Sequence, residues 1–130
     1  MSEPTPSIES VLARLTTEFI DTCRERMDDV EAKVSTLAAH KNDPSDDLSA
    51  VKRTIHSIKG QAGTFGFPTI GRIAEALEAY IDAIGRPKAG NLDAIRDHLD
   101  AIRKIVERRE NPSPEEEARI VRDLPPVTAN

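Results

Sequence analysis

The sequence predicts an all-α protein: an antiparallel up-and-down four-helix bundle followed by a flexible, proline-rich C-terminal tail. Apolar residues recur every three or four positions through most of the first 110 residues, which is the period of a helix with one buried face. No segment alternates apolar and polar residues as a half-buried strand would. Because short breaks separate the four periodic stretches, successive helices are expected to run antiparallel.

The first helix is expected from Leu12 to about Ala39, after a flexible lead over residues 1–6. Its apolar positions keep helical spacing over about seven turns. The pattern fits one long helix and equally a short helix followed by a long one. The apolar positions are Leu12, Leu15, Phe19, Cys23, Met27, Val30, Val34 and Leu37.

The second and third helices follow the break "HKNDPSDD". Ser45 or Asp46 is the expected N-cap of the second helix. Gly66 is placed to end that helix with a left-handed C-terminal cap, and Pro68 suits the first turn of the third. The expected buried faces consist of Leu48, Val51, Ile55, Ile58, Ala62 and Phe65, and then of Ile70, Ile73, Ala74, Leu77, Ile81 and Ile84.

A fourth helix is expected after the loop "GRPKAG", with Asn91 as its cap and Leu92, Ile95, Leu99, Ile102 and Val106 on its buried face. The expected bundle therefore covers residues 7–110. Residues 111–130 hold four of the nine prolines and are expected to form a mostly flexible tail, in which "SPEEEARIVRDL" has the composition of a short helix.

Composition narrows the function classes. The 130 residues suit one domain, and the formal net charge of −5 argues against nonspecific nucleic-acid binding and against anionic membranes. No apolar run approaches the roughly 20 residues of a membrane span, and the N-terminus lacks the pattern of a signal peptide. We therefore expect a cytoplasmic protein without nucleic-acid or membrane partners.

Metal and thiol chemistry have little support in the sequence. The single cysteine, Cys23, excludes an internal disulfide and lies on an apolar stripe, so it is expected in the core. His40 and His98 lack neighbouring ligands for a metal site, and His98 is expected to face solvent. No metal site and no intrinsic cofactor are predicted.

The run "HSIKGQAGTFGF" is the unusual feature of the second helix. On a helical wheel, His56 lies on the order of 130° from the buried direction and points to water. Lys52 and Lys59 flank it on the same face, and Gly60 and Gly63 lie along the same side. Each glycine inside a helix costs roughly 1 kcal/mol relative to alanine, so the glycines need a reason.

A strip without side chains beside an exposed imidazole lets another protein approach the ring. The lysines suit an anionic group, most obviously a phosphoryl group. The alternative is an ordinary surface histidine beside glycines that permit close helix packing. Since Gly60 and Gly63 lie away from the apolar stripe, packing does not explain them. Ala62 or Phe67 is a candidate for the partner surface.

The segment "TIHSIKGQAGTFGFPTIGRIAEALE" resembles histidine-containing phosphotransfer (HPt) domains, whose hallmark is His-x-x-Lys-Gly on the second helix of a four-helix bundle. It is most similar to the phosphotransfer domain of chemotaxis histidine kinases. The resemblance covers residues 15–107 in architecture and 56–78 in specific motif. Gln61 departs from the Ser, Gly or Ala of many relatives, which we expect to alter partner preference rather than chemistry.

The resemblance implies a role for each matching residue. His56 would be the phosphoacceptor through Nε2, Lys59 would stabilise the phosphoryl charge, and Gly60 would clear the approach. Glu78 on the third helix would accept a hydrogen bond from Nδ1. The wheel supports Glu78, which lies roughly 80° from the centre of the buried stripe, over Glu75, at about 140°.

The implied function is a stand-alone HPt protein that shuttles phosphoryl groups between receiver domains, or from a histidine kinase, in a two-component phosphorelay. The chain runs from a start methionine into a proline-rich end, and nothing in it resembles an ATP-binding kinase domain. The Mg²⁺ for transfer is expected on the partner. One alternative is the phosphoacceptor module of a chemotaxis-type kinase. Another is a helical bundle that binds receivers without being phosphorylated.

Overall fold

The computed structural model describes residues 7–39 and 44–127 as an all-helical chain, as the sequence predicts. These ranges contain five α-helices and no strand. The helices are α1 (Ile8–Ala38), α2 (Pro44–Ala62), α3 (Pro68–Ile84), α4 (Ala89–Arg108) and α5 (Pro114–Asp123). No helix in the described ranges is long and apolar enough to cross a membrane.

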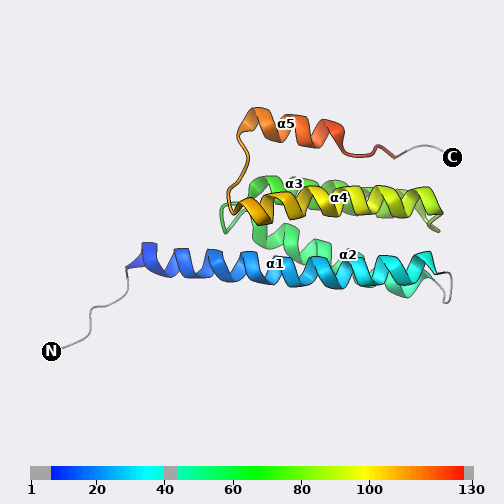
Figure 1. The fold of residues 1–130 in the computed structure, drawn as a ribbon, viewed down its shortest axis with the longest axis horizontal. Coiled ribbons are helices and arrows are strands. Elements are labelled where there is room, and N and C mark those ends of the chain that lie inside the picture. Colours follow the sequence, from blue (N-terminus) through cyan, green and yellow to red (C-terminus); the bar gives the residue numbers. More distant parts are fainter. Residues whose placement is uncertain (1–6, 40–43, 128–130) are drawn as a thin grey trace.

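The first four helices lie alongside one another, and α5 lies outside them beside α3 and α4 (Figure 1). α1 packs against α2 and α4, while α3 packs against α2, α4 and α5. The first turns of α1 extend past the ends of the other helices (Figure 1), which leaves Ile8 and Leu12 exposed.

α1 is a single helix of 31 residues, which resolves the choice between one helix and two. It begins earlier than predicted, because the Ser7 hydroxyl accepts a hydrogen bond from the Ser10 N–H at 3.0 Å and caps the N-terminus.

Two predicted caps are wrong. α2 begins at Pro44, so Ser45 and Asp46 lie inside its first turn, and the position before Pro44 lies outside the described residues. α4 begins at Ala89 with Lys88 at the N-cap, and Asn91 is the third helical residue. The Asn91 Oδ1 accepts a hydrogen bond from the Lys88 N–H at 2.8 Å. The side chain of the third helical residue thus binds back to the backbone of the N-cap residue.

The turn from α2 to α3 follows the prediction more closely. Pro68 is the first residue of α3. α2 ends at Ala62, four residues before Gly66, whose φ of +89° is the left-handed geometry that glycine adopts most readily.

The core is aliphatic, with a small aromatic cluster at the α2–α3 end. Phe19 stacks on Phe65 and Phe67, with ring centroids 5.4 and 5.9 Å apart. Phe67 and Ala62 are buried, so the expectation that either belongs to a partner surface is wrong. Cys23 is fully buried, as expected, and burial raises the pKa of its thiol to about 11.

His98 is buried, and the prediction that it faces solvent is wrong. Its Nδ1 lies 2.7 Å from the Ala94 carbonyl oxygen, which can only accept, so Nδ1 carries the proton. The ring packs against Tyr80 with centroids 5.6 Å apart. Burial lowers the pKa of His98, which favours the neutral ring.

Residues 111–124 contact the bundle, where the sequence predicts a mostly flexible tail. Within this segment, α5 confirms the short helix predicted for "SPEEEARIVRDL". The Thr69 hydroxyl donates to Glu117 at 2.9 Å, and Arg72 Nε lies 3.3 Å from the same carboxylate. Asn111 Oδ1 accepts from the Thr69 N–H at 3.0 Å, so this segment is joined to the start of α3.

Candidate functional site

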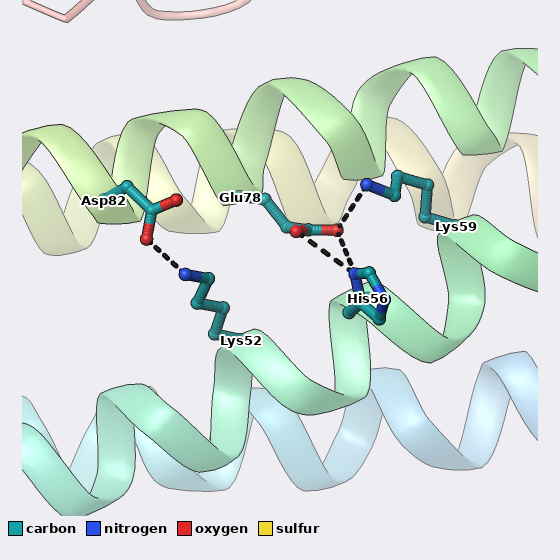
Figure 2. A network of polar contacts seen from close by, with 5 residues as sticks. All are labelled: Lys52, His56, Lys59, Glu78 and Asp82. Atoms are coloured by element: carbon teal, nitrogen blue, oxygen red, sulfur yellow. Dashed lines mark hydrogen bonds and ion pairs between the residues drawn. The ribbon is translucent and has the colours of Figure 1, made fainter.

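The candidate site lies on the surface where α2 and α3 pack together. Figure 2 shows three side chains of α2 reaching two carboxylates of α3: Lys52, His56 and Lys59 from α2, and Glu78 and Asp82 from α3. The spacing of three or four residues on each helix brings these groups to the shared edge, because residues one helical turn apart lie on one face.

His56 presents an exposed ring with one nitrogen fixed. Its side chain is 69% exposed, and Nδ1 lies 3.2 and 3.3 Å from the two Glu78 carboxylate oxygens. A carboxylate only accepts hydrogen bonds, so Nδ1 is the protonated nitrogen. In the neutral ring this leaves the lone pair on Nε2, at the end of the ring away from Glu78.

Glu78 also contacts Lys59. The Lys59 ammonium lies 3.2 Å from Oε1 of Glu78, the same oxygen that is 3.2 Å from His56 Nδ1. The Glu78 side chain is only 13% exposed. This carboxylate is therefore held between a cation and the imidazole, at the boundary position that the wheel predicts for it.

Lys52 pairs with Asp82, one turn along from the His56–Glu78 contact. The hydrogen bond that Lys52 donates to Asp82 is the main cause of the raised pKa of Lys52. The sequence analysis missed Asp82. Its signal was the spacing, since Asp82 follows Glu78 by four residues as His56 follows Lys52 by four.

The glycines beside His56 leave open space. A Cβ added at Gly60 or Gly63 would meet no atom within 4 Å, so neither glycine serves close helix packing. The packing glycine is Gly71 on α3, where a Cβ would lie 3.7 Å from the Ala62 Cβ and 3.8 Å from the Lys59 carbonyl oxygen. The sequence analysis did not single out Gly71.

A hollow of about 400 Å³ lies on the N-terminal side of His56, lined by Ser49, Lys52, Arg53, His56 and Glu78. A second hollow of about 440 Å³ shares Ser49 and Lys52 and continues toward the loop after α3. Within the described residues, no group of three or more His, Cys, Asp and Glu side chains is arranged to hold a metal ion.

Comparisons with known proteins agree on one family. The family model described as Hpt domain matches residues 14–111. The chain is similar to the chemotaxis protein CheA of Rhizobium meliloti (33% identical over 66 residues, 51% of this chain), of Salmonella typhimurium (35% over 68, 52%) and of Cereibacter sphaeroides (30% over 92, 69%). The matched segments cover 9, 10 and 13% of those proteins, so the chain spans about a tenth of these relatives. No solved structure matches the chain at a significant level.

Proposed function

Since this chain belongs to the Hpt domain family, we propose that it carries phosphoryl groups, accepting them on His56 Nε2 and passing them on within a two-component phosphorelay. The proposal rests on the contact between His56 and Glu78, which engages one of the two ring nitrogens. Nδ1 is bound to Glu78, whereas Nε2 is on an exposed ring beside an open strip.

The proposed transfer at His56 has the following steps. The Nε2 lone pair attacks the phosphorus of a phosphoaspartate or of the ATP γ-phosphate, a P–N bond forms, and the P–O bond to the leaving carboxylate or ADP breaks. The ring then carries a positive charge, with its Nδ1 proton retained. Glu78 stabilises that charge through the hydrogen bond already present. Onward transfer reverses these steps, and the lone pair returns to Nε2.

Lys59 and Glu78 act together in this proposal. Lys59 holds the carboxylate that orients the ring, because its ammonium contacts Oε1 of Glu78. Gly60 and Gly63 keep the approach to Nε2 free of side chains. Lys52, paired with Asp82, borders the hollow beside the ring.

We further propose that α1 to α4 form an antiparallel up-and-down bundle as the phosphotransfer unit, residues 7–110. Its support is the closed set of neighbours, in which α1 contacts α2, α2 contacts α3, α3 contacts α4 and α4 contacts α1. Short connections between successive helices favour this arrangement.

The proposed partners are receiver domains of response regulators and a histidine kinase, and the exchange is placed in the cytoplasm, where ATP is available. The proposal assigns neither an ATP-binding kinase domain nor an intrinsic cofactor to the described residues. In transfer from ATP or from a receiver domain, Mg²⁺ neutralises the developing charge, and we propose that the partner holds this ion.

A second candidate function is the phosphoacceptor module of a chemotaxis-type histidine kinase. The relatives named chemotaxis protein CheA favour it, because this chain matches about a tenth of each. A bundle that binds receivers without phosphorylation is the remaining alternative, and it leaves the His56–Glu78 pairing without a purpose.

The test incubates wild type and His56→Gln with a phosphorylated receiver domain, or with a histidine kinase and radiolabelled ATP. We expect acid-labile, base-stable label on wild type alone. His56→Gln should stay folded because the side chain is 69% exposed. Absence of label on folded wild type from several donors would instead favour the unphosphorylated bundle.

A further inference from the structure

Three cations of α2 surround His56, and the structure separates them into two kinds. Lys52 pairs with Asp82 and Lys59 pairs with Glu78, both across to α3. Arg53 is exposed and makes no hydrogen bond or ion pair with any of the described residues. The charges of the two lysines are thus balanced by carboxylates, and that of Arg53 is not.

The paired lysines and the unpaired Arg53 lie on opposite flanks of His56. At about 100° per residue, Lys52 and Lys59 lie about 40° and 60° from His56 on one side of α2. That side faces α3, as their contacts show. Arg53 and Gly60 lie about 60° and 40° from His56 on the other side.

The contact with Glu78 holds one nitrogen of the His56 ring and leaves the other on an exposed ring. Nδ1 is turned toward α3 by its contact with Glu78 (Figure 2). Nε2 lies at the ring edge away from that contact. Arg53 and His56 line the same hollow, which brings the side chain of Arg53 beside the ring that carries Nε2.

We propose that Arg53 is the residue of this chain that binds the phosphoryl group during transfer to and from His56, an inference that rests on the proposed function. As the P–N bond forms at Nε2 and the donor's P–O bond breaks, the phosphoryl oxygens remain anionic. The planar guanidinium matches two of those oxygens and forms charge-assisted hydrogen bonds to them. Lys59 stays with Glu78 and positions the ring.

The test uses phosphoramidate, a small donor that phosphorylates histidine without a protein partner, and follows the phosphohistidine by ³¹P NMR. Four variants are compared with wild type: Arg53→Gln, Lys59→Gln, His56→Gln and Arg24→Gln. Arg24 is an exposed arginine of α1 that lines neither hollow near His56, so its variant matches the charge change of Arg53→Gln. Circular dichroism confirms the fold of each.

We expect Arg53→Gln to lower the phosphorylation rate about tenfold, the size of one lost charge-assisted hydrogen bond. It should also raise the pKa of the bound phosphoryl group in a ³¹P titration, because a neighbouring cation favours the dianion. Lys59→Gln should change this titration less, and Arg24→Gln should match wild type.

Other outcomes separate the two proposals. If Arg53→Gln matches wild type while wild type is labelled on His56, or if Lys59→Gln shifts the titration more, the role of Arg53 is wrong and the proposed function stands. If Arg53→Gln slows transfer only from a phosphorylated receiver, Arg53 contacts the partner protein and the inference is overturned. If wild type takes up no label, or label persists in His56→Gln, both proposals fail.

Discussion

At the scale of single residues, His56 and Glu78 divide the site between an exposed ring and a largely buried carboxylate. The helical wheel places both, because each position follows from the apolar stripe of its own helix. It does not reveal that Lys59 shares the same Glu78 oxygen, since that depends on a long side chain turning toward a neighbouring helix. Nor does the wheel reveal that Arg53 lacks a carboxylate partner among the described residues, since that depends on which side chains the neighbouring helices present.

Gly60 allows stability and access to be separated. Gly60→Ala should raise the free energy of unfolding by about 0.5–1 kcal/mol, because alanine favours the helix and its Cβ meets open space. Gly60→Leu should remain folded and slow transfer from a protein donor, because its side chain occupies the approach to Nε2. Urea unfolding and receiver-dependent labelling measure the two effects.

Phosphoramidate provides the control for Gly60→Leu. This small donor can reach Nε2 without a protein surface docking over Gly60, so it should label the variant nearly as fast as wild type. Undiminished transfer from the protein donor would show that Gly60 and Gly63 are not needed to let the partner approach His56.

At the scale of elements, the start of α3 depends on a residue far along the chain. Phe67, at the N-cap, has no side chain that can cap the helix. The Thr69 N–H donates instead to Asn111 Oδ1 at 3.0 Å, and Thr69 also bonds Glu117 of α5. The α4–α5 connection therefore completes the helix that carries Glu78.

Asn111→Ala should lower the free energy of unfolding by about 1 kcal/mol, the usual cost of a lost N-terminal cap. Asn111→Asp keeps an acceptor at the helix N-terminus and should recover most of the loss. Chemical denaturation of wild type and both variants measures this. Equal stability of all three would show that the Thr69 N–H finds another acceptor.

Helix existence was predictable from periodicity, whereas helix ends were not. The apolar repeat predicted α1 to α4 because each buries one continuous face. The helix starts differ from the prediction, because Lys88 rather than Asn91 is the N-cap residue of α4 and because Asn111 caps α3 from another part of the sequence. α5 buries no residue fully, so periodicity gave it only a weak signal.

At the scale of the whole molecule, burial of His98 ties the stability of the core to pH. The ring is neutral in the folded protein, because burial lowers its pKa below the ordinary value of 6.5. The unfolded chain therefore binds a proton that the folded protein excludes as pH falls through about 6.5. The contribution of His98 to stability is complete above that pH and declines below it.

We expect wild type to lose more stability between pH 7.5 and 5.5 than His98→Phe, which keeps an aromatic ring beside Tyr80 without a titrating group. Urea unfolding at several pH values gives both slopes. The comparison cancels the contributions of all groups that the two proteins share. Parallel slopes for the two proteins would mean that His98 is protonated equally in the folded and unfolded states.

The chain has one cysteine, Cys23, at the middle of the core with its thiol pKa raised to about 11. Only a thiolate reacts readily, so alkylation at neutral pH has to pass through molecules that have opened transiently. The ratio of its labelling rate to that of an unprotected thiol is then the equilibrium constant for opening. The rate at which Cys23 is alkylated thus reports how often the bundle opens. It can be measured with and without a phosphoryl group on His56.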